Sequence, residues 1–114
     1  MLAENIFLKI INRQIPAKLI HEDDLCIAFH DIHPQAPTHI LIIPKKEIRT
    51  HDDIGEEDEK TLGRMHLVAK KIASQLGLKD GYRLVLNCNE HGGQTVPHLH
   101  MHLLGGRPLS WPPG

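Results

Sequence analysis

The sequence predicts a single α+β domain, in which a meander-like antiparallel sheet of about five strands packs with one long and one short helix. The chain has 114 residues, close to the usual size of one domain. Short apolar stretches of strand type outnumber stretches of helical periodicity, and their connections allow antiparallel pairing. Hydrophobic residues make up 40% of the chain, enough for one core. We therefore expect one domain over residues 1–114 with the helices on one side of the sheet.

Two stretches have the apolar spacing of amphipathic helices. The short helix begins after Asn5, a good N-cap residue, and Pro16 stops it. The long helix covers about residues 58–76, where apolar positions recur every three or four residues, and Gly77 is placed to end it. The acidic residues at its start suit the helix dipole, and a solvated face is enough to explain them.

Five stretches are typical of strands, and the segments between them contain turn residues. The Asp-Asp pair at 23–24 is a turn that pairs the first two strands as a hairpin. Two prolines make residues 33–37 a rigid connector, and the loop 88–97 precedes the last strand. Residues 105–114 form a proline-rich tail. The expected strands cover residues 18–22, 26–32, 38–44, 82–87 and 98–104.

The charge pattern and the cysteine count exclude several classes of protein. Lysine and arginine (13) almost balance aspartate and glutamate (14), and no basic run is present, so binding to duplex nucleic acid is not expected. The longest apolar run, Ile40–Ile43, is far too short to cross a membrane. The two cysteines and the lack of a secretory leader predict a cytoplasmic location.

Histidine is the residue type that points to function, because the chain contains ten. Three of them, His98, His100 and His102, alternate with apolar residues in the last expected strand. Since side chains two residues apart in a strand share a face, the three imidazoles should point one way and the apolar residues the other. This alternation, beside a loop with a Gly-Gly pair, predicts a functional site.

A metal site is one interpretation of these histidines, because imidazole is a common zinc ligand. In an extended strand His98 and His102 would lie about 13 Å apart, too far for one ion to hold both. Two strand histidines together with His39 or His91 could still form a site. The two cysteines stand alone and add no ligand pair.

A nucleophile between two helper histidines is the other interpretation. A neutral imidazole can attack phosphorus, and its neighbours can position charge and protons. The segment 92–95 offers a cradle for phosphate oxygens, because glycines let backbone N–H groups approach closely and Gln94 and Thr95 can donate hydrogen bonds. The residues by themselves leave both interpretations open.

The segment His98–Leu104 matches the signature His-φ-His-φ-His-φ-φ, where φ is apolar, at every position. It closely resembles the histidine triad (HIT) family, and further segments are similar to the Hint branch, the histidine triad nucleotide-binding proteins. The third histidine, His102, is present, whereas the nucleotidyltransferase branch has glutamine there. The similar segments are residues 6–11, 15–18, 29–32, 34–39, 43–46, 92–95, 105–107 and 111–114.

The resemblance implies a HIT-like fold, a homodimer whose two sheets join into one, and hydrolysis of purine nucleoside phosphoramidates and aminoacyl-adenylates to AMP or GMP. It implies neither a cofactor nor a metal. His100 would be the nucleophile that forms a nucleotidyl-histidine. His102 and Thr95 would lie beside the leaving group, and His98, with His39 behind it, would orient the nucleophile.

The same resemblance implies how a purine nucleoside monophosphate is bound. Asp31 would accept hydrogen bonds from the ribose hydroxyls, as an ionised carboxylate can. The phosphate would be held by Asn87, Gly93, Gln94, Thr95, Val96, His100 and His102. The base would lie in an apolar slot lined by Ile6, Phe7, Ile10, Phe29, His30, Ile32 and Leu41.

Two positions depart from the branch, and the tail has two readings. Pro97 stands where an aromatic residue is frequent, and His33 replaces a small polar residue. Trp111 would either lie at the leaving-group side of a partner's site or fold onto its own domain. A nucleotide-binding regulator with incidental turnover and a zinc-binding protein remain as alternative functions.

Overall fold

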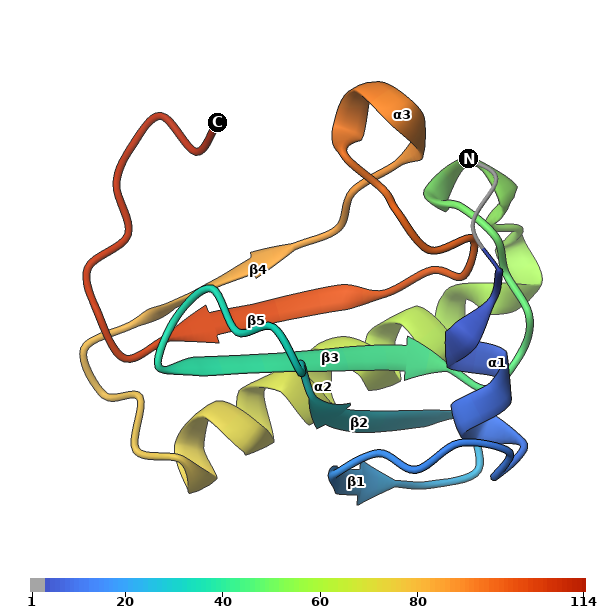
Figure 1. The fold of residues 1–114 in the computed structure, drawn as a ribbon, viewed down its shortest axis with the longest axis horizontal. Coiled ribbons are helices and arrows are strands. Elements are labelled where there is room, and N and C mark those ends of the chain that lie inside the picture. The colour runs from blue at the N-terminus through green and yellow to red at the C-terminus, as the bar shows by residue number, and fades with distance from the viewer. Residues whose placement is uncertain (1–3) are drawn as a thin grey trace.

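The computed structural model of the protein describes residues 4–114 and shows one five-stranded sheet with helices of unequal length (Figure 1). The helices are α1 (Ile6–Ile11), α2 (Glu59–Gln75) and α3 (Asn89–Gly92), and the 3-10 turns η1 (His51–Asp53) and η2 (Glu56–Asp58) precede α2. The strands are β1 (Leu19–Glu22), β2 (Cys26–His30), β3 (Thr38–Pro44), β4 (Tyr82–Val85) and β5 (Met101–Gly105).

All strand pairs of the sheet are antiparallel, and the strands lie in the order β1-β2-β3-β5-β4. The α+β class and the antiparallel sheet of five strands are therefore confirmed. β1, β2 and β3 form a meander, but the chain then passes through α2, and β5 is inserted between β3 and β4. The last strand of the chain thus has a neighbour on each side.

α2 covers one face of the sheet and forms the larger core with it. Met65 and Ile72 of α2 are almost fully buried, as their helical spacing predicts. None of the helices within residues 4–114 is long and apolar enough to cross a membrane. The sheet residues packed in this core are Cys26, Ala28, Ile40, Ile42, Met101 and Leu103.

α1 covers part of the opposite face, so the prediction that the helices share one side is wrong (Figure 1). Phe7 of α1 is buried in a second cluster with Phe29 and Leu41. The physical reason lies in β2 and β3, which are buried at nearly every position and need a cover on both faces. With six residues, α1 is too short to cover the whole of that face.

The last strand begins at Met101, three residues later than predicted. The Leu99 N–H donates to the Ile48 carbonyl oxygen at 2.7 Å, which holds this segment against the loop after β3 and not in the strand ladder. His98 and His100 therefore precede the strand, and the strict alternation of strand side chains does not apply to them.

Three other segments differ from the expected elements. The strand predicted over 26–32 ends at His30, and the one predicted over 82–87 ends at Val85. The loop 88–97 contains the short helix α3, which Gly93 closes in the left-handed conformation, at φ 85°. A residue with a side chain would be strained at that position.

Carboxylates hold the hairpin turn and the start of α2. Asp23 accepts hydrogen bonds from the N–H groups of Leu25 and Cys26, at 2.7 and 2.9 Å, which confirms the predicted turn. Asp58 is buried and accepts from Lys46 Nζ at 2.6 Å and from a backbone N–H of the preceding loop. Asp58 is thus not part of the solvated face expected for the acidic residues here.

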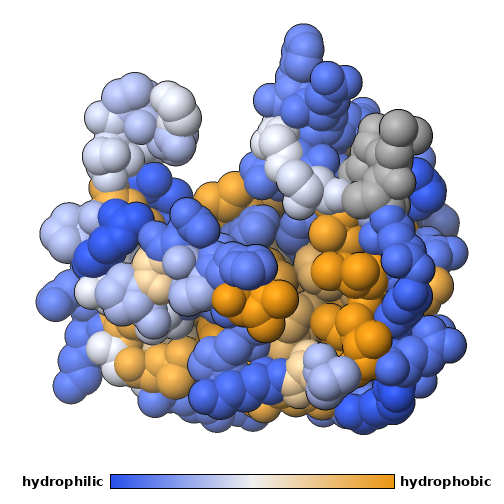
Figure 2. Space-filling model, in the orientation of Figure 1, coloured by the Kyte–Doolittle hydropathy of each residue, from blue (hydrophilic) through white to orange (hydrophobic). Residues whose placement is uncertain are grey.

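The C-terminal tail and α3 form two projections with a hollow between them (Figure 2). Arg83 of β4 donates to the Ser110 carbonyl oxygen at 2.8 Å, and Arg107 donates to that of Gln35 at 2.8 Å. Trp111 is 81% exposed, so the reading in which it folds onto its own domain is wrong.

Candidate active site

The histidines meet on the face of the sheet that α1 covers only in part. His102 lies on β5 opposite Leu41 of β3, and His39, two residues before Leu41, points to the same side. The ring centres of His100 and His102 are 4.9 Å apart, and those of His39 and His102 are 5.2 Å apart. The structure thus brings together His39, His100 and His102.

The hydrogen bond of His100 fixes where its proton lies. Nδ1 is 2.7 Å from the carbonyl oxygen of His98, which can only accept, so Nδ1 carries the proton and Nε2 has the lone pair. Nε2 has no hydrogen-bond partner among residues 4–114, whereas every fully buried side-chain nitrogen or oxygen there has one. The Nε2 atom therefore reaches the surface of the protein, where a substrate could meet it.

A second chain of hydrogen bonds fixes the proton of His102. The Gln35 N–H donates to His39 Nδ1 at 3.0 Å, so the proton of His39 is on Nε2. His39 Nε2 lies 2.9 Å from His102 Nδ1, which must then accept. The proton of a neutral His102 is therefore on Nε2, so His102 presents an N–H donor next to the lone pair of His100.

Burial keeps all four histidines of this cluster neutral near pH 7. It lowers the pKa of His39, His98 and His100 below the usual value. The pKa of His102 falls to about 4, because burial is reinforced by repulsion from His100 and His39 when His102 is charged. Neutral rings agree with the alternating donors and acceptors that the hydrogen bonds require.

His98 lies apart from the surface, and its ring is used within the protein. Nε2 lies 2.8 Å from the Pro44 carbonyl oxygen, and Nδ1 lies 3.1 Å from the side-chain nitrogen of Asn5. The expectation that His39 lies behind His98 is wrong, because His39 contacts His102 across the β3–β5 pair. His98 contacts His100 through its main-chain oxygen.

The loop before the histidines contributes less to a phosphate cradle than the sequence suggested. The Gln94 side chain is buried and bonded to the backbone of Arg49, Asn89 and Val96, and the Gly93 and Gln94 N–H groups donate to carbonyl oxygens of α3. Gln94 therefore supports the loop and is not free to hold a phosphate. Among the hydrogen bonds of residues 4–114, none uses the N–H of Thr95 or Val96, so these two stay available.

Asp31 lies just after β2, close to the cluster. Its Oδ1 accepts from the His33 N–H at 2.7 Å, and its Oδ2 lies 3.5 Å from His39 Nε2. The Asp31 side chain is partly exposed, and its nearness to His39 is compatible with the predicted contact to ribose. Asn87 follows β4 and is also half-buried.

The residues predicted to line the base slot divide into two groups. Phe7, Phe29 and Leu41 are buried in one cluster with Ile10 at its edge, and Phe7 lies edge-on to His100 with ring centres 5.0 Å apart. His30 is half-buried at the end of β2. The structure does not place Ile6 and Ile32 in this cluster, since they are 40% and 84% exposed. Figure 2 shows apolar residues at the surface over α1.

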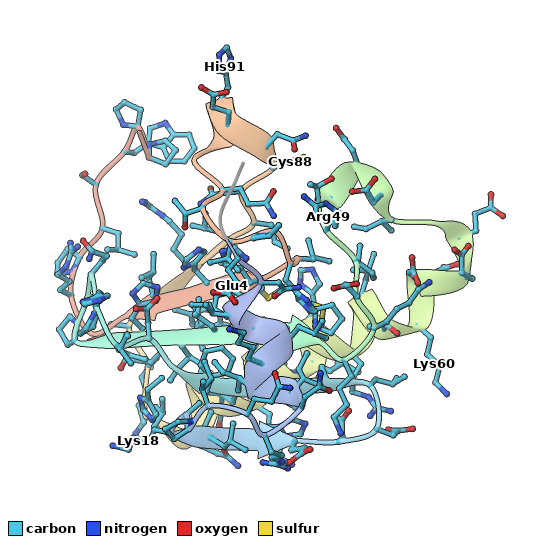
Figure 3. The ribbon with its side chains drawn as sticks, turned by 45° about the vertical axis from the view of Figure 1, so that its right-hand side comes forward. Glu4, Lys18, Arg49, Lys60, Cys88 and His91 are labelled. Carbon is cyan, nitrogen blue, oxygen red and sulfur yellow. The ribbon has the colours of Figure 1, made fainter. Side chains whose placement is uncertain are left out.

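Within residues 4–114, the side chains could hold a metal ion at two places. Ligand atoms of Asp31, His39 and His102 lie within 4.8 Å of one another, and so do those of His21, Asp23 and Cys26. Neither cluster contains the pair of histidines proposed from the sequence as metal ligands. His98 cannot be one of that pair, because both of its ring nitrogens bind groups within the protein. His91 lies at the outer end of α3 and points away from the sheet (Figure 3).

Sequence reasoning missed two groups that the structure brings to the histidines. Asn5 was expected only to cap the first helix, and Gln35 was expected only as part of a connector. The Asn5 side chain contacts His98, which is 93 positions away, and Gln35 contacts His39 through its backbone N–H. Neither kind of contact has a local sequence signal. The spacing that places Asn5 one residue before an apolar helix was the only hint.

Comparison with known proteins agrees with this geometry. Residues 12–109 match the family model described as HIT domain. The chain belongs to the HIT domain family. The purine nucleoside phosphoramidase of Escherichia coli K12 is 61% identical over 110 residues, which are 96% of this chain and 92% of that protein. An uncharacterised HIT-like protein of Synechocystis is 54% identical over the full length of both chains.

Solved structures of HIT proteins show the same fold. A HIT family hydrolase of Legionella pneumophila superposes with a TM-score of 0.95 at 52% identity, covering 97% of this chain and all of that one. A histidine triad protein of Clostridium difficile has a TM-score of 0.88 at 42% identity, with 92% of each chain covered. The HIT-like fold expected from the resemblance is confirmed.

Proposed function

We propose that this HIT protein is a hydrolase that cleaves the phosphorus–nitrogen bond of purine nucleoside phosphoramidates, acts in the same way on aminoacyl-adenylates, and releases AMP or GMP. The arrangement of protons carries the proposal: His100 presents a lone pair on Nε2, and neighbouring His102 presents an N–H. Transfer from phosphorus needs such a nucleophile beside a proton donor. The name of the E. coli relative supports this substrate class.

In the first step, the Nε2 lone pair of His100 attacks phosphorus while the bond to the amine breaks. The electron pair of the broken bond leaves with the amine nitrogen, which takes a proton from solvent while the Nε2–H of His102 donates a hydrogen bond to that nitrogen, so His102 stays neutral. His100 keeps its Nδ1 proton, so the nucleotidyl-histidine is cationic and is stabilised by the carbonyl oxygen of His98. The positive charge makes the ring a good leaving group.

In the second step, a water molecule attacks phosphorus and breaks the bond to His100 Nε2. The water gives one proton back to solvent, and the electron pair of the broken bond returns to His100, so both rings end neutral as they began. The sum of both steps is a phosphoramidate and water giving a nucleoside monophosphate and an amine. No metal or redox partner is needed for this balance.

The nucleotide would span the surface from the loop before β5 to α1. We assign the phosphate to Asn87 and to the free N–H groups of Thr95 and Val96, the ribose to Asp31, and the base to the apolar cluster around Phe7. The Thr95 side chain is exposed, and we assign it to the side where the amine would leave.

We also propose that two copies pair through β4 as a homodimer. Among residues 4–114, β4 has a strand neighbour only on its β5 side, and Tyr82 at its start is exposed. Pairing of β4 with its symmetry copy would satisfy the free backbone groups of this edge and join the two sheets. The tail with Trp111 would then reach the leaving-group side of the second copy.

The test of the activity is incubation with adenosine phosphoramidates of several amines and detection of AMP. Release of AMP and free amine in equal amounts is expected, and catalysis should persist over many turnovers. Tight AMP binding without any turnover would replace the proposed hydrolase by a nucleotide-binding regulator. Comparison with guanosine phosphoramidates would define the base preference.

A further inference from the structure

The side chain of Asn5 connects the first helix with the histidine cluster. Its Oδ1 accepts a hydrogen bond from the Leu8 N–H at 2.9 Å, which caps α1. Its Nδ2 lies 3.1 Å from Nδ1 of His98 and 3.4 Å from Oε2 of Glu47. One carboxamide thus joins α1, the first triad histidine and the loop after β3.

The cap determines which end of the carboxamide faces His98. Because the Leu8 N–H requires an acceptor, Oδ1 must face the helix, and the Nδ2 group must face His98. This group can only donate, so Nδ1 of His98 is unprotonated and the proton lies on Nε2, where the Pro44 carbonyl oxygen accepts it at 2.8 Å. His98 is fully buried, so bulk water is not a substitute donor.

Both sides of the nucleophile depend on this connection. The His98 carbonyl oxygen receives the Nδ1 proton of His100, and Phe7, two residues after Asn5, lies edge-on to His100 with ring centres 5.0 Å apart. Phe7 is also edge-on to His98, at 6.5 Å. A shift of α1 or of His98 would therefore change the direction in which His100 Nε2 points.

We propose that Asn5 is a positioning residue for the reaction: its carboxamide fixes His98 in the Nε2–H tautomer, holds α1 against the histidines and thereby orients His100 for attack. The catalytic part of this inference rests on the proposed function. The role requires an acceptor and a donor on one short side chain. Serine or threonine would cap α1 equally well, but their hydroxyl is too short to reach His98, and an ionised aspartate has no donor for it.

Two variants separate the donor from the cap. Asn5→Asp keeps the size and the capping oxygen but places a carboxylate against Nδ1 of His98 and near Glu47. Since Pro44 holds the Nε2 proton, His98 should then take a second proton, despite the nearby His100 ring. Asn5→Ser keeps a capping oxygen but does not reach His98. Asn12→Asp, at the exposed end of α1, is the control for a new charge on this helix.

The first measurement needs no substrate. Nitrogen-15 NMR of the imidazole rings at pH 7 should show His98 protonated only on Nε2 in the wild type and in Asn12→Asp, and on both nitrogens in Asn5→Asp. A wild-type His98 with its proton on Nδ1 would overturn the proposal. So would an Asn5→Asp spectrum in which His98 is unchanged.

The second measurement is hydrolysis of an adenosine phosphoramidate. Asn5→Asp and Asn5→Ser should each lower kcat about 10-fold and change KM less than about two-fold, because the orientation of the nucleophile is affected and the binding contacts are not. Asn12→Asp should match the wild type. A lower thermal midpoint with unchanged kcat would show a helix cap only and overturn the positioning role. A wild type that releases no AMP would refute the proposed function, and the NMR result would still decide the His98 tautomer.

Discussion

Two clusters of titratable side chains in this protein differ in charge. The hairpin cluster is built around an ionised carboxylate, and the histidine cluster consists of neutral rings. In the hairpin cluster, Asp23 accepts from His21 Nε2 at 2.7 Å, from Arg64 at 3.2 Å and from the Leu25 and Cys26 N–H groups. Burial raises the pKa of Asp23, but these donors together outweigh it and hold the pKa well below its usual range. Burial and the neighbouring Asp23 raise the pKa of the Cys26 thiol to about 12.

In the histidine cluster, by contrast, burial lowers the pKa of each ring, and the neighbouring groups do not compensate for it. The rings therefore stay neutral. The hairpin cluster satisfies its charge within the protein, whereas the histidine cluster leaves a lone pair on His100 and a proton on His102 for a substrate. Titratable residues close together therefore indicate a site only where some of their atoms remain unpaired at the surface. Substitutions in each cluster and changes of pH test this difference between the two clusters.

The largest effect is expected for His100→Ala. Loss of the nucleophile should lower kcat/KM for phosphoramidates about 10³-fold or more, while AMP affinity should change less than about five-fold because the other contacts remain. His21→Ala, in the hairpin cluster, is the matched control and should leave kcat/KM unchanged. Steady-state kinetics and AMP titration check both. A fully active His100→Ala protein would remove His100 from the mechanism.

Asp23→Asn, in the hairpin cluster, is expected to change the stability of the protein and not its activity. It should lower the free energy of unfolding by about 1–3 kcal/mol, because Arg64 and His21 lose an ionised partner, and it should leave kcat/KM of the folded protein unchanged. Urea unfolding provides the measurement. Asp24→Asn is the control. Asp24 is largely exposed, and its contact with Arg64 is long, at 3.6 Å, so its loss should change the stability little. Loss of activity without loss of stability would contradict the structural role of Asp23.

The two clusters should also lose stability in different pH ranges. The buried histidines resist protons that the unfolded chain takes up, so stability falls as the pH drops below the ordinary histidine value of 6.5 toward about 4. Asp23 has a lowered pKa, so its contribution is present above its ordinary value of 3.8 and is lost below it. Urea midpoints at pH 7, 5 and 3 should show the Asp23→Asn deficit at pH 7 and 5 and a smaller deficit at pH 3. A wild-type stability that is flat from pH 7 to 5 would contradict neutral buried rings.

A smaller, selective effect is expected from the tail. Removal of residues 110–114 leaves Arg107 in place, which holds the Gln35 carbonyl oxygen. If Trp111 borders the leaving group of a second copy, kcat/KM should change by about 2- to 10-fold and unequally among amines, with AMP affinity constant. A set of phosphoramidates that differ only in the amine measures this. A uniform loss would mean that the tail supports the fold or the dimer alone.

The smallest effect is expected from removal of metal. The ligand atoms of both candidate metal clusters largely bind one another or the backbone, so a chelator should change neither the rate nor the thermal midpoint. Elemental analysis is the accompanying measurement. Stoichiometric zinc that is lost together with activity would revive the zinc-binding alternative.

Local patterns predicted much of the fold. The long helix was placed within one residue at each end because Met65, Ala69 and Ile72 repeat at helical spacing, and the strands followed from short apolar runs between turn residues. The strand order and the cover of the second face by α1 were not predicted. Both depend on contacts between segments that are distant along the chain.

The candidate site divides in the same way. The alternating histidines near position 100 identified the cluster, because that pattern is rare and local. The partner predicted for His39, His98, was wrong, because the observed contact to His102 joins residues 63 positions apart. The role of Gln94 was also wrong, because its side chain is used by the Arg49 carbonyl oxygen 45 positions away. Asn5 and His98 are 93 positions apart, and no sequence pattern connects them.

A covalent nucleotide on His100 is the most direct consequence of a neutral ring with an unpaired Nε2. Excess protein should be mixed with an adenosine phosphoramidate of a slow leaving amine, quenched without acid within a single turnover, digested and mapped by mass spectrometry. We expect the mass of AMP on the peptide that contains His100, located at that residue, and its decay in step with AMP release. Release of AMP with no burst and no adduct, or an adduct on His102, would contradict attack by His100.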